Sequence, residues 1–347
     1  MTKRKNKLEE VFDINSDSRL TFLEKESLLQ SIIQEAKRRR RRKLIRNIGA
    51  VAAVCIGVLI FFHNKYISQP LQRADIRSIA HKHSQQFTSD STIQIASLEL
   101  QQYNTSVIPI KESTAFDGEQ LVLSKFNSQE GYSTLYIPYG KRREVILPDG
   151  STVWLNSGSY FTYRNNFEED LREVYLNGEA FFDIKRNGKQ FVVRTAQADI
   201  MVLGTSFNAS SYEDDDFFSI ELLTGKVELN SPRKNFSTIA MNSGDRVMID
   251  FLKNNIRREK NSLGDDVLWT KRQLALKNVT MGELLKRMER IYNIKINALE
   301  EVYKMDIGYS GRLNVAVDIE KSLQSIYELR NYDIRLKEKE VLITKKK

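Results

Sequence analysis

The chain has 347 residues, with 54 lysines and arginines against 45 aspartates and glutamates, and a formal net charge of +9. Seven of the cations stand together at residues 37–43, so the rest of the chain is close to neutral and no general polyanion-binding surface is expected. The only cysteine, Cys55, excludes an intramolecular disulfide and a cysteine-rich metal site, and the length allows two or three domains.

The distribution of histidine also excludes classes of site. His63, His81 and His83 are the three histidines, and the residues that follow them contain none. A Ser-His-Asp or Cys-His catalytic arrangement in the C-terminal part is therefore excluded, as is a zinc site based on histidine. His81 and His83 could bind a metal weakly, but in a polar linker we interpret them as bystanders. We predict no catalytic residue, no metal and no cofactor.

Residues 1–43 are expected to form a cytoplasmic segment with a short amphipathic helix. Thr21-Phe-Leu-Glu24 fits a capping box, and apolar residues then recur at helical spacing. So short a segment cannot bury a core alone, and its apolar stripe is expected to dock into a partner, with the membrane surface as the alternative. The residues expected at this contact are Leu20, Phe22, Leu23, Leu28, Leu29, Ile32 and Ile33.

Residues 44–62 are predicted to form one transmembrane helix. Ile48–Phe62 carries no charged or strongly polar side chain, and Leu44 and Ile45 extend the window to near the roughly 20 residues that span a bilayer. A buried core helix or a cleaved signal peptide fits less well, because the run follows a block of cations and begins far from residue 1. By the positive-inside rule that block faces the cytoplasm; it comprises Lys37, Arg38, Arg39, Arg40, Arg41, Arg42 and Lys43.

The next two regions differ in periodicity. Residues 63–130 are polar and weakly periodic, which predicts a periplasmic linker with short structured pieces and a plausible cleavage region. Residues 131–252 show strand patterns separated by turn residues, which predicts an all-β domain. Its expected strands are 141–147, 152–155, 172–176, 180–184, 191–195, 200–203, 207–211, 217–223 and 226–229.

Three short stretches within the β domain have specific expectations. Pro148-Asp-Gly150 is a turn signal, because proline presets φ and glycine accepts a positive φ. Asn177-Gly178 is expected to be a turn between two strands. Glu213–Asp216 lacks the ligand spacing of calcium loops, so we interpret it as a solvated hairpin tip.

Residues 266–347 are predicted to form a small α+β domain. Strand 273–277, helix 280–292 and strand 294–297 make one β-α-β half. Strand 307–313, helix 318–327 and a hairpin of 334–336 with 341–344 make the other half. Thr280-Met-Gly-Glu283 is a capping box that marks the start of the first helix. Two such halves pack helices on a sheet.

Several blocks of the β domain resemble the FecR family. They are Leu147-Pro-Asp-Gly-Ser-Thr-Val-Trp-Leu-Asn156, Val174–Asp183, Phe191–Thr195, Val202–Asn208 and Leu223–Val227. The last 80 residues resemble the C-terminal domain of many family members, which is related to signalling modules of secretins and TonB-dependent receptors. The motif residues are Leu147, Pro148, Asp149, Gly150, Trp154, Leu155, Asn156, Gly178, Glu179, Gly204, Thr205, Phe207 and Gly225. We favour a structural role for them, with the glycines in turns and Trp154, Phe182 and Phe207 in the core.

The resemblance implies a single-pass inner-membrane regulator. Its C-terminal bulk would be periplasmic and would receive the signalling domain of a TonB-dependent outer-membrane receptor. Its cytoplasmic segment would hold or release an extracytoplasmic-function sigma factor, and regulatory proteases are possible further partners. No direct nucleic-acid contact is expected. The alternatives are a membrane-anchored periplasmic enzyme acting on glycans, and a periplasmic binding or structural module without a sigma partner.

Overall fold

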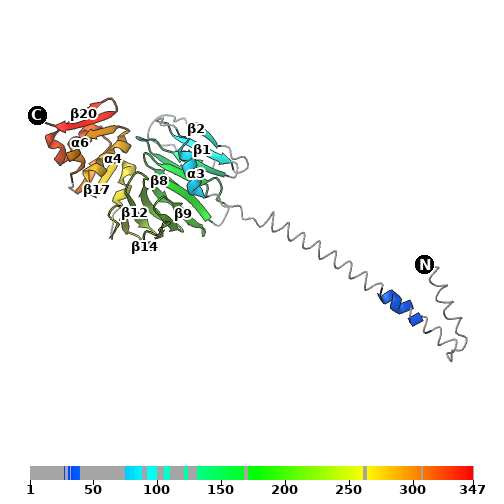
Figure 1. Cartoon of the computed structure of the whole chain (residues 1–347). Helices are drawn as coiled ribbons and strands as arrows, with labels where there is room; N and C mark the ends of the chain where they lie inside the picture. Colours follow the sequence, from blue (N-terminus) through cyan, green and yellow to red (C-terminus); the bar gives the residue numbers. More distant parts are fainter. Residues whose placement is uncertain are drawn as a thin grey trace, which may run out of the picture. The chain divides into compact units, whose positions relative to one another are not determined.

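A computed structural model describes residues 27, 30–31, 33–39, 75–87, 92–99, 105–109, 121–123, 131–167, 171–260, 264–305 and 308–346. The chain divides into two units, Met1–Arg73 and Ala74–Lys347. Figure 1 shows the second unit as a folded body that holds nearly all of the described elements.

The described part of the first unit is helical. Residues 27, 30–31 and 33–39 adopt helical geometry, and Arg39 Nη2 donates to Glu35 Oε1 over 2.9 Å one turn earlier. Ile33, one of the predicted contact residues, is 38% exposed. The other six, the cations after Arg39 and the predicted transmembrane segment 44–62 lie outside the described residues. Among the residues that are described, no helix is long and apolar enough to cross a membrane.

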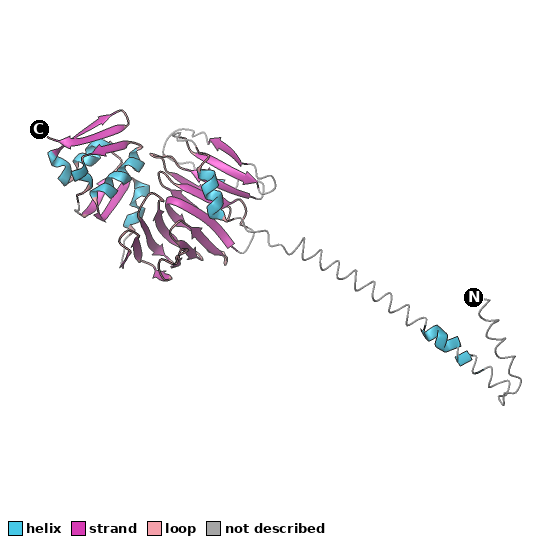
Figure 2. Ribbon diagram, viewed as in Figure 1, coloured by secondary structure: helices cyan, strands magenta, loops and turns pink. Residues whose placement is uncertain are grey.

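The second unit begins with a β domain of two sheets that share strand β8. The first sheet has the order β2-β1-β4-β7-β8-β9-β10-β13-β14, and the second has β3-β5-β6-β8-β11-β12-β15-β16. Strands dominate this region (Figure 2), as the predicted all-β domain requires. The bounds are β1 Gln94–Glu99, β2 Thr105–Pro109, β3 Leu121–Val122, β4 Gly131–Tyr136, β5 Arg143–Ile146, β6 Thr152–Leu155, β7 Tyr160–Arg164, β8 Leu171–Asp183, β9 Gln190–Arg194, β10 Asp199–Val202, β11 Ser206–Ser211, β12 Phe217–Thr224, β13 Lys226–Asn230, β14 Ile239–Asn242, β15 Arg246–Asp250 and β16 Asn255–Glu259.

Strand β8 runs without a break through Asn177-Gly178, so the predicted turn at that dipeptide is wrong. Its first half pairs with β7 and β9, and its second half pairs with β6 and β11. Gly178 has φ +137°, and a Cβ added there would lie 2.6 Å from Ser159 Cα. The glycine therefore serves a close backbone approach where the strand crosses from one sheet to the other.

The core of the β domain is rich in aromatic side chains. Phe161, Phe182, Phe191, Phe207 and Phe218 are all 0% exposed. The rings of Phe182 and Phe207 stack with centroids 4.8 Å apart. Burying each such side chain contributes about 1.5–3 kcal/mol. The core assignment of Phe182 and Phe207 is thus confirmed.

The prediction of a linker over residues 63–130 is wrong for the parts of it that are described. Helix α3 (Ile76–Ser84) and strands β1, β2 and β3 belong to the β domain, where β1 pairs with β4. Ile76, Ile79 and Ala80 pack against Tyr132 and Tyr175. The apolar residues of α3 span only about one helical turn, and its other residues are polar. The composition of this stretch therefore indicated a linker.

The C-terminal domain follows the predicted order of two β-α-β halves and a closing hairpin. β17 and β19 form one antiparallel pair, and β18, β21 and β20 form a second sheet in which β18 and β21 are parallel. Thr280 accepts from Glu283 N over 3.3 Å, which confirms the predicted cap. The bounds are η2 Asp265–Lys271, β17 Gln273–Val279, α4 Met281–Tyr292, β18 Lys295–Ala298, α5 Glu300–Tyr303, β19 Tyr309–Asn314, α6 Ile319–Gln324, η3 Tyr327–Asn331, β20 Tyr332–Lys337 and β21 Glu340–Lys345.

Candidate functional site

The motif Leu147-Pro-Asp-Gly150 closes the turn between β5 and β6 and anchors a buried arginine. Gly150 has φ +78°, as the predicted turn requires. Asp149 accepts from Arg172 Nη1 over 2.6 Å, and the Arg172 side chain is 0% exposed. Arg172 also donates to the carbonyl oxygens of Lys185 and Lys189 over 2.9 and 2.7 Å. This part of the motif therefore stabilises the fold, and sequence reasoning did not single out Arg172.

Other motif residues also have structural positions. Leu147, Leu155 and Thr205 are buried. Trp154 is only half-buried, so the prediction that it belongs to the core is wrong. Gly225 has φ +90° and lies at the corner where the chain leaves β12 in one sheet for β13 in the other. Gly204 is not in a positive-φ turn; a Cβ there would lie 2.6 Å from Arg186 Cβ.

Two motif residues, Asn156 and Glu179, instead face the C-terminal domain. Asn156 Nδ2 donates to Glu179 Oε2 over 2.7 Å, and Asn208 Nδ2 donates to Glu179 Oε1 over 3.0 Å. Asn208 Oδ1 accepts in turn from Trp269 Nε1 over 3.0 Å. Burial raises the pKa of Glu179, and the two amide donors partly oppose that rise. The cluster thus fixes η2, which leads into the C-terminal domain, to β8 and β11.

A second contact joins α4 to the loop between β11 and β12. Arg290 donates to both carboxylate oxygens of Asp215 over 2.7 and 2.8 Å, and to Asp214 over 2.7 Å. Its guanidinium carbon lies 3.8 Å from the centroid of the Tyr212 ring. The side chains of Arg290 and Asp215 are only 4% and 5% exposed. The prediction of a solvated tip is therefore wrong for Asp215, which lies in an interdomain contact.

The neighbouring cations lower the pKa of Asp214 in this loop. Burial alone would raise the pKa of Asp214, but Arg290 and Lys286 outweigh it and hold the pKa below its usual value. Lys286 also pairs with Asp215 over 2.8 Å. In the described part of the chain, no group of three or more metal-ligating side chains occurs, here or elsewhere.

The segment before β17 completes the junction between the domains. Glu221 accepts from the backbone N–H groups of Gly264 and Asp266 over 3.1 and 2.8 Å. Arg246 Nε donates to Asp266 Oδ2 over 2.7 Å. Burial raises the pKa of Glu221, and the adjacent Asp266 raises it further. We call the contacts of Asn208, Glu179, Asp215, Glu221 and their partners the domain junction.

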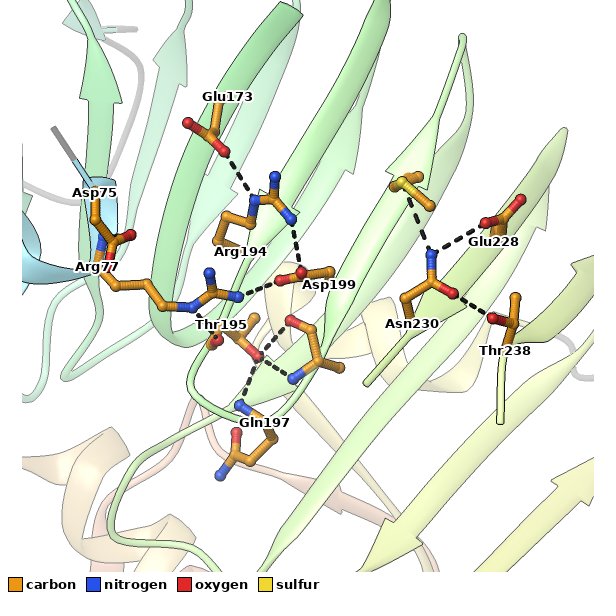
Figure 3. A network of polar contacts seen from close by, with 12 residues as sticks. Asp75, Arg77, Glu173, Arg194, Thr195, Gln197, Asp199, Glu228, Asn230 and Thr238 are labelled. Atoms are coloured by element: carbon orange, nitrogen blue, oxygen red, sulfur yellow. Dashed lines mark hydrogen bonds and ion pairs between the residues drawn. The ribbon is translucent and has the colours of Figure 1, made fainter. Parts of the chain in front are cut away.

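On another part of the β domain, ion pairs hold helix α3 in place. Arg77 pairs with Asp199 and donates from Nε to Thr195 O over 3.2 Å. Arg194 bridges Asp199 and Glu173 over 2.6 and 2.8 Å. Figure 3 shows Arg77 reaching from the start of the helix toward Asp199, which lies between the two arginines. The first helix of the folded unit is therefore fixed to β8, β9 and β10.

The last turn of α3 buries His83, which the sequence placed in a linker. His83 Nδ1 lies 2.7 Å from Thr134 Oγ1, and the residue is 0% exposed. Burial lowers the pKa of His83 to about 4, and Lys82 lowers it further. His83 is thus a neutral core residue at neutral pH. The predicted linker position is therefore wrong for His83, which is buried in the β domain.

The arrangement connects a helix, a β domain and a C-terminal domain through ion pairs and hydrogen bonds. Tyr175 and Glu179 both lie on β8, the former under α3 and the latter at the domain junction. These charged groups are paired with one another, so the contacts hold the two domains together. Of the predicted motif residues, Asn156 and Glu179 are brought together at the domain junction. The sequence did not predict that Asn208, Trp269, Arg290 and Asp215 also contribute to this junction.

Comparisons with known proteins place this fold. Residues 133–228 match the family described as FecR protein. Two crystal structures of proposed anti-sigma factors from Parabacteroides distasonis ATCC 8503, at 2.50 and 1.65 Å resolution, are 28% and 29% identical to the chain, each with a TM-score of 0.57. The alignments cover 62% of this chain and 100% and 99% of those chains. No curated protein matches. Residues 133–228 therefore form a FecR-like domain.

Proposed function

We propose that this protein is a single-pass inner-membrane anti-sigma regulator. In this proposal it relays a periplasmic signal from a TonB-dependent outer-membrane transducer to an extracytoplasmic-function sigma factor. The observation that carries the proposal is the FecR domain, whose fold is shared with proposed anti-sigma factors. The basic run at residues 37–43 and the apolar run at 48–62 support a cytoplasmic N-terminus and a periplasmic bulk.

The fold supports a mechanism of release or cleavage. A single membrane helix transmits small shifts poorly, because coupling needs an element with two states that both sites can bias. The domain junction, with its ion pairs between Arg290 and Asp215, is an element that could exist docked or undocked. Residues 75–87 are folded into the β domain, so we place proteolysis by regulatory proteases before them, within residues 63–74.

The sigma-binding step is tested in the full chain in its native host. One variant replaces Leu28, Leu29, Ile32 and Ile33 with serine, and a matched control replaces the polar neighbours Lys25, Gln30, Gln34 and Glu35 with serine. We expect the apolar variant to change transcription of one sigma regulon and to lose crosslinking to that sigma factor. The control should retain both. If neither variant alters any sigma regulon and no sigma factor crosslinks, the chain is a periplasmic binding or structural module instead.

The topology is tested separately. Alkaline phosphatase fused after residue 347 should be active, since that enzyme folds only outside the cytoplasm, and the same fusion after residue 43 should be inactive. The opposite pattern would refute the proposed orientation. Changing the cations at residues 37–43 to glutamine should weaken the bias, because Lys and Arg near the membrane set the orientation.

A further inference from the structure

The chain contains two Asn-Gly dipeptides, and the structure places them in contrasting surroundings. Asn177-Gly178 lies inside strand β8, where Asn177 is paired with β7 and Gly178 with β11. Asn187-Gly188 lies in the loop between β8 and β9, and both of its residues are exposed. In such a dipeptide the glycine nitrogen can attack the asparagine side chain, because glycine has no Cβ to hinder the approach. The two copies therefore allow one reaction to be compared in an open and in a constrained position.

The side chain of Asn187 is folded back over the peptide group that follows it. Its Oδ1 accepts from Lys189 N over 3.1 Å, which is the contact of an Asx turn. This N–H donates to the oxygen on which negative charge develops when Cγ is attacked. Gly188 has φ +83°, and a Cβ built there would meet no described atom within 4 Å. The Gly188 nitrogen therefore has room to move toward Cγ of Asn187.

The charge of the loop also favours this attack. Lys185, Arg186 and Lys189 lie within two residues of Asn187, and residues 184–190 include no acidic side chain. The attacking nitrogen becomes nucleophilic when it loses its proton. Nearby positive charges stabilise that anionic form, so they should accelerate the reaction.

Asn177 is held in a way that opposes the same attack. Its Oδ1 accepts from Glu213 N over 3.1 Å, which fixes the side chain to the loop between β11 and β12. Gly178 is buried, and a Cβ built there would lie 2.6 Å from Ser159 Cα. Gly178 would have to leave its pairing with β11 before its nitrogen could reach Cγ of Asn177. The continuous strand therefore protects this dipeptide.

We propose that Asn187 is a site of spontaneous deamidation, and that its isoaspartate product loosens the loop between β8 and β9. The Gly188 nitrogen gives up its proton and forms a bond to Cγ of Asn187, and the Cγ–Nδ2 bond breaks to release ammonia, which carries a proton away. Water then opens the resulting cyclic imide. Opening at Cγ gives aspartate, whereas opening at the main-chain carbonyl gives isoaspartate, whose main chain runs through Cβ and Cγ.

The isoaspartate product affects the fold because Arg172 holds this loop at two points. Its guanidinium donates to Lys185 O over 2.9 Å and to Lys189 O over 2.7 Å. The Arg172 side chain is 0% exposed and is fixed by Asp149. Isoaspartate adds one carbon to the main chain between the two carbonyl groups, so the loop must rearrange and one contact is lost. A buried donor that loses its acceptor destabilises the folded state.

The test follows both asparagines in the full chain in lipid nanodiscs. The protein is incubated at mildly alkaline pH in water enriched in a heavy oxygen isotope, which labels acid formed before digestion. Cleavage after glutamate places Asn177 in peptide 174–179 and Asn187 in peptide 180–213. Mass spectrometry measures the conversion of amide to acid, and electron-transfer fragmentation distinguishes isoaspartate from aspartate. We expect Asn187 to react at least about tenfold faster than Asn177.

Matched samples separate the effect of the fold from that of the local sequence. In urea, both asparagines should react at similar rates, because the strand no longer protects Asn177. Gly188→Ala should slow the reaction at Asn187 by about tenfold, since the methyl group hinders the nitrogen. The amide of Lys185 donates to Ser151 Oγ over 3.0 Å, and its hydrogen exchange should accelerate about tenfold in the aged chain. Asn187→Gln, aged in parallel, should show no such change.

The proposal is overturned if Asn187 stays intact in the folded chain, or if Asn177 reacts equally fast there. A difference that persists in urea would also overturn the structural explanation. Isoaspartate at Asn187 with unchanged exchange at Lys185 would overturn the loosening of the loop. The measurement needs no sigma factor, so its failure leaves the proposed regulatory function standing. Conversely, a failed sigma crosslink does not affect the mass spectrometry.

Discussion

The ion pairs of Arg290 make a quantitative prediction about how firmly the C-terminal domain is docked. Arg290→Gln removes the guanidinium that contacts Asp214 and Asp215 and leaves a carboxylate that is 5% exposed without its main partner. Breaking a buried pair by removing one member costs about 3–5 kcal/mol. Lys286 still contacts Asp215, so we take the lower end of that range. At about 1.4 kcal/mol per tenfold, the docked state should lose roughly 100-fold in its equilibrium.

Hydrogen exchange of the full chain measures this change directly. The amide of Gly140 donates to Arg290 O over 2.8 Å, and the amides of Gly264 and Asp266 donate to Glu221. These amides become exchangeable when the domains separate, so their exchange should accelerate roughly 100-fold if opening is in rapid equilibrium. Arg335→Gln is the matched control, because Arg335 is 77% exposed and pairs with Asp333 two residues away.

Two results would refute this reasoning. Unchanged exchange at Gly140, Gly264 and Asp266 would mean that Arg290 does not hold the domains together. Equal acceleration of the β8–β11 ladder would mean that the β domain itself is destabilised. The double variant Arg290→Gln with Asp215→Asn should recover part of the loss, because it removes the buried unpaired charge as well.

Three further predictions concern the β domain. The pKa of His83 falls from 6.5 to about 4 on folding, so the unfolded state binds more protons between those values and stability is lost as pH drops through that window. The loss is on the order of 3 kcal/mol, and urea titrations of His83→Gln should show a flatter pH profile. Gly178→Ala places a methyl group 2.6 Å from Ser159 Cα and should destabilise the chain by more than Gly188→Ala, which has φ +83° and open space; thermal unfolding of both compares them, and equal losses would contradict the proposed close approach. Asp149→Ala leaves Arg172 buried without its carboxylate and should cost about 3 kcal/mol in urea unfolding, whereas Asp183→Ala at the exposed end of β8 should cost far less.

Local patterns predicted the C-terminal domain well, because its information is short-range. Helix α4 begins at Met281 after its predicted cap and ends at Tyr292 as expected. Its apolar residues recur at helical spacing, and both neighbouring strands follow within a few residues. The β domain differs, since Asn177-Gly178 carries a hairpin signal yet lies inside a continuous strand. Only the close approach of Ser159, the residue just before β7, explains the glycine.

The candidate site was predicted in part for the same reason. Asn156 and Glu179 stood out through the family blocks, but their partners are distant along the chain. Trp269 lies 61 residues from Asn208, and Arg290 lies 75 residues from Asp215. Charge complementarity between the acidic run at 213–216 and the basic residues of helix 281–292 is the one signal that could have indicated the contact. The pairing of β1 with β4 is also non-local. It was not predicted, because the polar composition around β1 indicated a linker.

Strand β8 also has a mechanical consequence. Tyr175 packs under α3 and Glu179 bonds at the domain junction, four residues further along the same extended strand. At about 3.3 Å per residue the two positions are roughly 13 Å apart. A force applied to α3 therefore reaches the contact with the C-terminal domain along one continuous backbone held on both sides by neighbouring strands, without passing through a loop. The stiffness of β8 over this distance would determine what fraction of a force on α3 reaches the domain junction. A large rearrangement of the β domain would not be needed.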